Sequence, residues 1–216
     1  MSGEDASSAR RQQEKTRDLA WVEAARNGDR RAYAHLVEAY QKRVYAIAFG
    51  VVRHREDAWD VAQEAFVKAY KHLDRFEGSA AFYTWLYRIT TNLAIDHIRE
   101  RKRKRTEPLE EAPPVRAPED HRADPEAAVD RAELGRILAD AMDQLSEKHR
   151  AIIVLREVEG LSYEEMAEVL GIAKGTVMSR LFHARQKLQE ILRPYVHVGE
   201  TDGLRISVRS EDGGTA

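Results

Sequence analysis

Residues 161–188, LSYEEMAEVLGIAKGTVMSRLFHARQKL, carry the pattern that decides the fold of this chain. Ser162 and Glu165 have the spacing of a capping box, in which each side chain bonds a free backbone amide at the start of a helix. Apolar residues then recur every three or four positions, as on the buried face of a helix, and Gly171 is a residue type that commonly ends one. The stretch therefore predicts a short helix, a tight turn over residues 172–174 and a second helix.

The second of these helices has one apolar and one polar face. Its apolar positions form a single stripe: Val177, Leu181, Ala184 and Leu188. Its polar positions share a face about a quarter-turn away: Thr176, Arg180, His183 and Lys187, with Ser179 beside them. Hydroxyl and cationic side chains bond to phosphates and base edges in the major groove of DNA. We therefore favour a DNA-reading helix-turn-helix over the alternative, a helical hairpin whose charged face is only solvated.

The composition is that of a folded protein without disulfides. The chain has 216 residues, of which 43% are hydrophobic, enough for one or two domains with apolar cores. The absence of cysteine excludes disulfides, iron–sulfur clusters and thiolate zinc sites, and suits a reducing compartment. No apolar run approaches the roughly 20 residues of a membrane span, and residues 1–15 lack the apolar core of a signal peptide. We expect a cytoplasmic chain without membrane insertion.

Charge is distributed unevenly along the chain. The net charge of −2 argues against a protein that coats nucleic acid indiscriminately. Cations concentrate in residues 99–105 and on the second helix of the hairpin, whereas acids concentrate between residues 107 and 133. This segregation suits local contacts to phosphates.

The spacing of apolar residues divides the chain into two helical domains. We expect a disordered tail over residues 1–16, a first domain over 17–105, a linker over 106–128, a second domain over 129–193 and a flexible tail over 194–216. Five prolines and many acids make the linker extended and partly stiff. No segment inside either domain has the pattern of a strand, so the predicted fold class is all-α: two helical domains joined by an extended acidic linker.

Within the first domain, helices are predicted from Asp18 to Gly28, from a cap at Asp29 through Val51, and from a cap at Asp57 through Leu73. The loop 74–81 then leads into a helix that begins near Phe82 and ends in the basic run. In the second domain, Ser146 is a further predicted cap. The tail contains a short alternation over residues 204–209, which could add a strand to the sheet of a partner, although we favour a tail without structure.

The helix after Phe82 carries a polar line at steps of three and four residues: Arg88, Asn92, Asp96, Arg99 and Arg103. Asparagine can read a base edge, arginines can bind phosphate, and Phe82, Tyr83 and Trp85 could stack on unpaired bases. The alternative is that the aromatic residues are core and that the basic run only offsets the helix dipole. Spacing alone leaves both interpretations open, and it favours simple solvation for the polar side of the 57–73 helix.

In their order, these motifs resemble a bacterial RNA polymerase sigma factor. The sequences DAWDVAQEAFVKAYKHL and FEGSAAFYTWLYRITTNLAIDHIRERKR, an acidic linker and the hairpin of residues 161–188 follow one another with the expected gaps. The resemblance runs from Trp21 to Leu192, and it is to the extracytoplasmic-function (ECF) group, the sigma-E-like branch of the sigma-70 family.

The resemblance implies three sets of site residues. It implies that the −10 promoter element, with one flipped base, is bound by Phe76, Gly78, Ser79, Ala80, Phe82, Tyr83, Trp85, Arg88, Asn92, Asp96, Arg99 and Arg103. It implies that the −35 element is read by Tyr163, Lys174, Gly175, Thr176, Met178, Ser179, Arg180, Phe182, His183, Arg185 and Lys187. It implies that core polymerase is bound by Asp57, Asp60, Gln63, Glu64, Val67 and Lys68, which reverses the solvation interpretation of that helix.

The implied partners are core RNA polymerase, promoter DNA and an anti-sigma factor. Core polymerase would be contacted at the clamp helices of its largest subunit and the flap of its second-largest, with the linker threading toward the active site. The implied role is to start transcription of a stress or envelope-response regulon, without a cofactor, a metal or catalytic residues. Many relatives carry arginine where this chain has Met178 and His183, so the promoter preference cannot be transferred.

Two other classes of protein fit part of the pattern. A stand-alone helix-turn-helix transcription regulator would bind duplex DNA without polymerase. A DNA-processing enzyme such as a recombinase is disfavoured, because the sequence has no glycine-rich phosphate loop and its eight histidines lack metal-ligand spacing.

Overall fold

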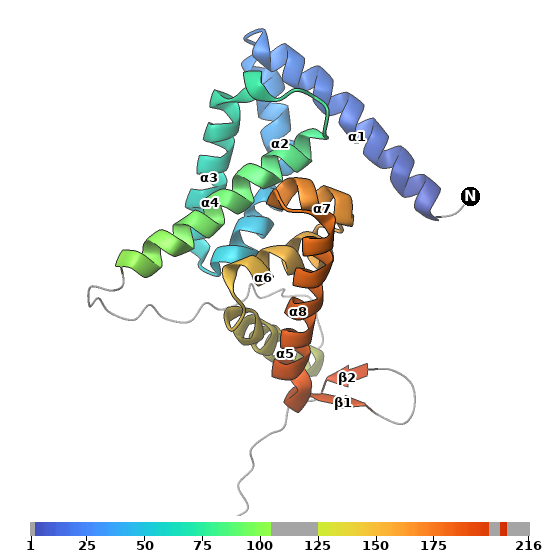
Figure 1. Cartoon of the computed structure of the whole chain (residues 1–216), viewed down its shortest axis with the longest axis vertical. Coiled ribbons are helices and arrows are strands. Elements are labelled where there is room, and N and C mark those ends of the chain that lie inside the picture. The colour runs from blue at the N-terminus through green and yellow to red at the C-terminus, as the bar shows by residue number, and fades with distance from the viewer. Residues whose placement is uncertain (1–2, 105–124, 199–203, 207–216) are drawn as a thin grey trace, which may run out of the picture.

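The computed structural model describes residues 3–104, 125–198 and 204–206, and it is built almost wholly from helices (Figure 1). The first helical unit comprises α1 (Gly3–Arg26), α2 (Arg30–Val52), α3 (Arg55–Lys71), the short 3-10 helix η1 (Leu73–Arg75) and α4 (Phe82–Lys104). The second helical unit comprises α5 (Pro125–Asp143), α6 (Glu147–Ile153), the π-helical segment η2 (Val154–Val158), α7 (Tyr163–Leu170) and α8 (Lys174–Leu192). The all-α fold class is confirmed.

Local hydrogen bonds begin and end the helices mostly where the sequence predicts. Asp29 caps α2 by accepting from the amides of Arg31 and Ala32. Ser146 caps α6 through the amide of His149. Ser162 and Glu165 form the complete capping box of α7, which ends at Gly171 in the left-handed conformation with φ of +63°. These caps satisfy backbone groups that a helix end would otherwise leave unbonded.

Three segments differ from expectation. The tail that we expected over residues 1–16 is helical from Gly3 onward, because residues 4–17 are rich in strong helix formers and need no apolar stripe to be helical. Helix α3 begins at Arg55, where His54 and not Asp57 provides the cap. In the C-terminal tail, the 3-10 turn η3 (Arg193–Tyr195) leads into β1 (Val196–Val198), which pairs antiparallel with β2 (Leu204–Ile206). Residues 105–124 of the expected linker lie outside the described residues, and residues 125–128 belong to α5.

The core of the first unit lies between α2, α3 and α4. Helix α2 buries one continuous stripe along its length, including Leu36, Tyr40, Val44, Ile47 and Val51. Helix α4 crosses α2 and α3 diagonally, and α1 packs along the amino-terminal part of α2 (Figure 1). The loop between α3 and α4 is therefore held at one end of the bundle, beside α1.

The two helical units pack directly against each other. Helix α7 lies against α4, and α6 lies against α2 and α4 (Figure 1). One continuous cluster of buried apolar residues includes Leu86 and Ile47 from the first unit and Ile152 and Met166 from the second. Burial of apolar surface is the dominant favourable term in such contacts, so the two units form one packed body in this structure.

Candidate nucleic-acid interface

The helix-turn-helix has the predicted arrangement of buried and outward-facing residues. Val177, Leu181 and Ala184 are buried against the rest of the second unit, which fixes the rotation of α8 about its axis. The candidate −35 residues that are exposed are Lys174, Gly175, Thr176, Met178, Ser179, Phe182, His183, Arg185 and Lys187. Arg180 and Tyr163 are half-buried. The structure thus places this set on one open surface around α8.

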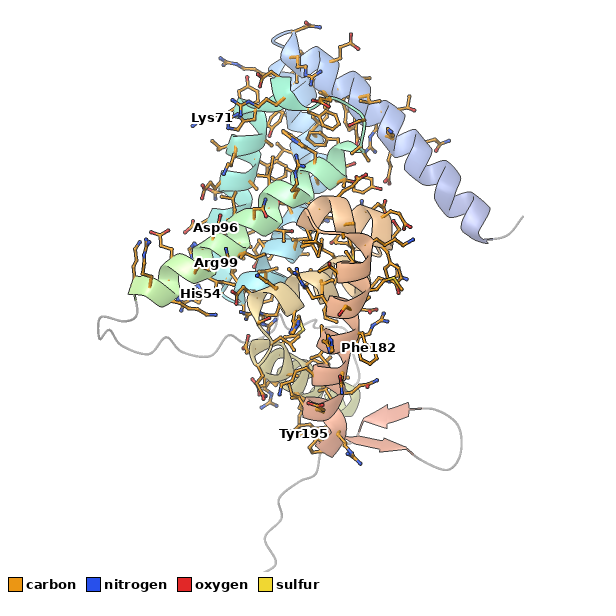
Figure 2. All side chains as sticks on the ribbon, viewed as in Figure 1. His54, Lys71, Asp96, Arg99, Phe182 and Tyr195 are labelled. Carbon is orange, nitrogen blue, oxygen red and sulfur yellow. The ribbon has the colours of Figure 1, made fainter. Side chains whose placement is uncertain are left out.

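Two apolar side chains project from the middle of this surface. Met178 is 51% exposed and Phe182 is 65% exposed, and Phe182 points away from α8 into open space (Figure 2). They are four residues apart and so lie on one side of the helix. Exposed apolar groups among cations suit contact with the methyl groups of thymine in a major groove.

The cations on and around α8 differ in their surroundings. Lys174 pairs with Glu164, and the Nη2 of Arg185 lies 2.6 Å from a carboxylate oxygen of Glu157. His149, from α6, and His183 line a hollow of about 320 Å³ between α6 and α8. Burial lowers the pKa of His149, and the neighbouring Arg180 and His183 lower it further.

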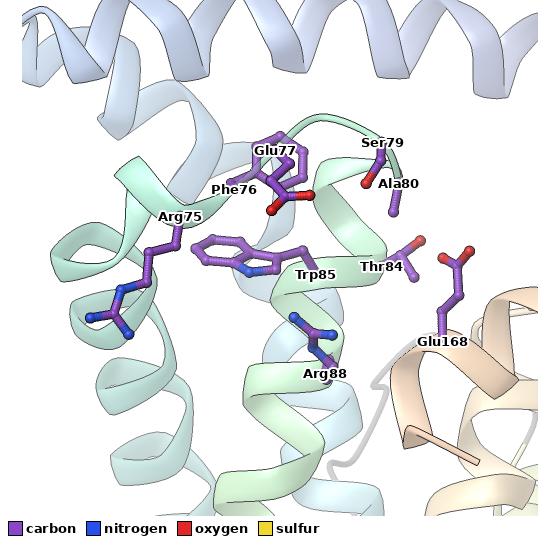
Figure 3. Close-up of a pocket in the computed structure, with 9 residues that line it drawn as sticks. All are labelled: Arg75, Phe76, Glu77, Ser79, Ala80, Thr84, Trp85, Arg88 and Glu168. Atoms are coloured by element: carbon purple, nitrogen blue, oxygen red, sulfur yellow. The ribbon is translucent and has the colours of Figure 1, made fainter.

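A second surface lies at the loop between α3 and α4. A cavity of about 460 Å³ opens here, with the indole of Trp85 along one wall and the guanidinium groups of Arg75 and Arg88 at its rim (Figure 3). Ser79 and Thr84 add hydroxyl groups, and Glu77 is the remaining polar side chain from the first unit, with Phe76 and Ala80 completing that part of the lining. An aromatic wall with polar groups opposite it can stack on one base and bond its edge, and guanidinium groups can bind the flanking phosphates.

Packing explains the conformation of this loop. Gly78 has a φ of +76°, and a Cβ built there would lie 3.2 Å from the Cδ2 of Leu19 in α1. Arg26 of α1 donates hydrogen bonds to the backbone carbonyls of Leu73, at 2.9 Å, and of Phe76. Helix α1 therefore supports the loop that forms the cavity.

Three predicted aromatic contacts with bases are not open in this arrangement. Phe76, Phe82 and Tyr83 are buried, and Phe82 is only 1% exposed. The rings of Phe76 and Phe82 meet edge to face at 5.6 Å, so both belong to the core. Of the aromatic residues proposed to stack on a base, only Trp85 is partly exposed, and it lines the cavity. Spacing left both interpretations of Phe82 open, because it cannot distinguish a core aromatic residue from an exposed one, and the structure places Phe82 in the core.

The polar line of α4 is present as predicted. Arg88, Asn92, Asp96, Arg99 and Arg103 are all exposed, and Asp96 and Arg99 project from the same part of α4 (Figure 2). Sequence reasoning missed other residues that line the cavity: Arg75, Glu77, Thr84 and Glu168. Arg75 and Glu77 lie within the predicted loop 74–81 and could have been included. Glu168 could not, because it comes from α7 in the other helical unit.

The candidate polymerase-binding face lies on α3. Asp60, Gln63, Glu64, Val67 and Lys68 are exposed along it. Asp57, one turn before Asp60, is half-buried at the border of this face. Its carboxylate lies 2.9 Å from Nη1 of Arg101 and 3.2 Å from Nε2 of His97, both on α4.

The same helix also exposes two aromatic side chains outside the predicted polymerase-binding set, Trp59 and Tyr70. Among the described residues, no helix is both long and apolar enough to cross a membrane. The same residues contain no group of three or more histidine, aspartate or glutamate side chains arranged to hold a metal ion.

Comparison with known proteins identifies the family. Residues 36–104 match the profile of Sigma-70 region 2, and residues 135–188 match that of Sigma-70, region 4. The chain is 40% identical to the RNA polymerase sigma-H factor of Pseudomonas aeruginosa, over 82% of this chain and 94% of that protein. It is 39% identical to the ECF RNA polymerase sigma-E factor of Haemophilus influenzae, over 84% of this chain and 98% of that protein.

Among solved structures, the chain resembles the sigma factor RpoE in complex with the anti-sigma factor NepR from Bartonella quintana. The TM-score is 0.61 at 25% identity, covering 74% of this chain and 96% of the other. The match to both sigma-70 regions, in order, and to full-length relatives shows that the chain belongs to the ECF group of the sigma-70 family, as a sigma-E-like RNA polymerase sigma factor for promoter-specific initiation of transcription.

Proposed function

We propose that this chain binds core RNA polymerase, reads the −35 element with α8, captures a base of the −10 element in the cavity beside Trp85, and so promotes opening of the promoter. The observation that carries the proposal is that one chain has two different surfaces suited to nucleic acid. The face of α8 suits intact duplex, and the cavity suits one unpaired base. Its role is recognition and strand capture, not catalysis.

The proposed division of labour follows the two helical units. Residues 17–105 would bind the −10 element and polymerase, and residues 129–193 would bind the −35 element. In the cavity, Trp85 would stack on the extruded base while Arg75 and Arg88 hold its phosphates. Extrusion costs a few kcal/mol of unstacking, which these contacts and polymerase would offset.

We propose that the exposed face of α3 binds the clamp helices of the largest polymerase subunit, and that the second unit binds the flap of the second-largest. Support comes from the mixture of exposed carboxylates with Val67 and Trp59 on one helix. A polar rim around exposed apolar side chains is typical of protein interfaces. The site of action would be the cytoplasm, where polymerase meets promoters.

An anti-sigma factor is a further proposed partner. The solved relative from Bartonella quintana is described in complex with the anti-sigma factor NepR. The regulon would be a stress or envelope response, in line with the sigma-E-like relatives.

Run-off transcription tests the proposal directly. Purified core polymerase from the same host, supplemented with this chain, should initiate at particular promoters from a fragmented genomic library. If core gains no promoter-dependent product and the chain alone binds a palindromic duplex tightly, the stand-alone regulator is the correct function.

The docking face can be tested separately. Replacing Asp60 and Gln63 with alanine should weaken association with core while the helical circular dichroism stays unchanged. Glu38→Ala, which removes an exposed carboxylate from α2, is the matched control and should bind core normally. Equal affinity of core for the double variant and the control would remove this face from the interface.

A further inference from the structure

A second hollow lies at the end of the first unit, where α1, α3 and η1 meet. It has a volume of about 500 Å³ and is lined by Ala25, Arg26, Tyr70, Lys71, Leu73 and Asp74. The short helix η1 lies between this hollow and the cavity beside Trp85, because its last residue, Arg75, lines that cavity whereas Leu73 and Asp74 line the hollow. Pockets of roughly 300–1,000 Å³ can hold a small ligand. The hollow belongs to neither DNA surface described above.

Tyr70 gives the hollow an aromatic ring that is held in place and partly open. Its side chain is 46% exposed. The ring of Tyr33 meets it at 4.8 Å with an interplanar angle of 60°. Tyr33 is itself fixed, because its hydroxyl donates a hydrogen bond to the carbonyl of Phe66 at 2.6 Å. A ring with a fixed orientation and an open surface can stack on an unpaired base of any type.

Two cations of the hollow have no carboxylate partner. Lys71 is exposed at the end of α3 (Figure 2). Arg26 donates hydrogen bonds to the carbonyls of Leu73, at 2.9 Å, and Asp74, at 3.4 Å, which hold its guanidinium group without neutralising its charge. Among the described residues, neither Arg26 nor Lys71 takes part in an ion pair. Phosphate oxygens are strong acceptors for such cations.

Positive charge continues on both sides of the hollow. Arg75 lies on the side of the cavity. On the other side, Arg30 and Arg31 are exposed at the start of α2, just after the turn that follows α1 (Figure 1). A nucleic-acid strand carries one phosphate per nucleotide, so a strand that leaves the cavity across η1 would meet cations along its path.

The distance across η1 is that of neighbouring nucleotides. Three residues of 3-10 helix rise about 6 Å, at about 2 Å per residue. A stacked strand advances about 3.4 Å per nucleotide, so the hollow would receive a base one or two positions from the base in the cavity. The polar line of α4 leads the other way, from Arg88 to Arg103, toward the second unit with its proposed −35 reader. The hollow therefore lies on the downstream side of the captured base.

We propose that the hollow between α1, α3 and η1 is a second nucleotide-binding site, which takes a nucleotide of the opened strand one or two positions downstream of the captured base. Tyr70 stacks on its base, Lys71 binds its phosphate, and Arg26 adds positive charge from the side of α1. The inference rests on the proposed capture of a −10 base beside Trp85. It extends the strand that this chain holds beyond that single base.

An abasic scan locates both sites on the strand. The probes are fluorescent non-template strands from a promoter on which wild-type chain and core polymerase give a run-off product, each with one base removed in turn. Their affinity for core carrying the wild-type chain should fall about fivefold or more at two positions, since loss of one stacking contact has this effect. With Trp85→Ala the loss at the upstream position should disappear, and with Tyr70→Ala the loss one or two nucleotides downstream should disappear.

Each loss is a ratio between the intact and the abasic strand on the same protein, so partial unfolding of a variant does not imitate the result. Tyr70→Phe keeps the ring and should behave as wild type. The affinity of the Tyr70→Ala chain for core should also equal that of wild type, because the proposed ligand is the strand.

Salt dependence tests the phosphate contact. Lys71→Gln should lower the slope of log affinity against log salt by about 0.7 on a strand that includes the two downstream nucleotides. A strand that ends at the captured base should show no change. Lys71→Arg should keep the slope of wild type, and so should Lys42→Gln, which removes an exposed cation elsewhere on α2.

Three results would overturn the inference: no position that depends on Tyr70, a dependent position upstream of the captured base, or weaker binding of core by Tyr70→Ala. The last result would make Tyr70 part of the polymerase-binding face. A position that depends on Tyr70 without one that depends on Trp85 would support this second site and refute capture beside Trp85, so the two proposals can fail separately.

Discussion

Tyr40→Phe removes one hydroxyl from the most deeply buried polar contact of the first unit. Tyr40 is 1% exposed and donates a hydrogen bond to Oδ2 of Asp18, which is itself 0% exposed. The other carboxylate oxygen, Oδ1, accepts from Arg17 at 2.7 Å and 3.1 Å. The phenylalanine ring can stay where the tyrosine ring packs, 5.8 Å from the ring of Phe82. The substitution therefore changes hydrogen bonding and not packing.

The expected cost follows from the charge of the acceptor. A hydrogen bond to an ionised group contributes about 1.5–3 kcal/mol, and a buried oxygen left without a partner bears its full desolvation cost. We expect Tyr40→Phe to lower the free energy of unfolding by about 2 kcal/mol. Because the contact joins α1 to α2, and α1 supports the loop that forms the cavity, the loss should also loosen the proposed −10 site.

Urea unfolding followed by tryptophan fluorescence measures the stability of the first unit, which contains this contact. All three tryptophans, Trp21, Trp59 and Trp85, lie in the first unit, so the signal reports on it. Tyr33→Phe is the matched comparison, because the Tyr33 hydroxyl donates to a neutral acceptor, the carbonyl of Phe66, at 2.6 Å. Its expected cost is about 1 kcal/mol. The reasoning would be refuted if Tyr40→Phe lowered the free energy of unfolding by no more than Tyr33→Phe does. It would also be refuted if Tyr40→Phe had the same cost in a chain that carries Asp18→Asn.

Other predictions concern the second unit. Ser162→Ala should destabilise α7 by about 1 kcal/mol, because the cap on the Glu165 amide is lost; faster amide hydrogen exchange in α7 alone would show it. Burial raises the pKa of the Glu159 carboxyl above its value in the unfolded chain, so folding favours the protonated form. The stability that this form contributes is therefore lost as pH rises through the raised pKa. Glu159→Gln removes this titration, so above about pH 4.3 the free energy of unfolding should fall less steeply with pH than in the wild type. The same slope in both proteins would contradict this. Arg180→Ala should cost about 1–3 kcal/mol of promoter binding and relax specificity at one base pair; an equal loss on every sequence would make Arg180 a phosphate contact.

The helix ends could be predicted from the sequence because their causes are local. Asp29, Ser146 and Ser162 each bond an amide two or three residues away, and Gly171 ends α7 through its own backbone conformation. Such contacts form whatever the rest of the chain does. The same is true of the outward face of α8, because three buried residues on one stripe fix the direction of all the others.

The start of α3 shows where local reasoning fails. Aspartate is a preferred residue type at the N-cap of a helix, and histidine, which stands three residues earlier at His54, is not. The structure gives the cap to the Nδ1 of His54, which accepts from the Asp57 amide at 3.4 Å. The carboxylate of Asp57 is bound instead by Arg101 and His97, forty or more residues away in the chain. The partners of this carboxylate are distant in the sequence, so local propensity does not describe them.

The contact between the helical units is the limiting case of this problem. An apolar stripe shows that a face is covered but not what covers it, so spacing could not show that Ile152 and Leu155 pack in one cluster with residues of the first unit. Tyr83 and Tyr87, four residues apart on α4, lie on the side of the helix away from its polar line, and their hydroxyls reach carboxylates of the second unit. The Tyr83 hydroxyl bonds Glu165 of α7, and the Tyr87 hydroxyl bonds Glu159 of the second unit as well as Arg43 of its own. In the last turn of α2, a Cβ built on Gly50 would lie 2.5 Å from Cγ2 of Val154. The close approach at Gly50 and the bond between Tyr83 and Glu165 both join the two units, so these residues are explained by the packing of one unit on the other and not by the pattern of either unit alone.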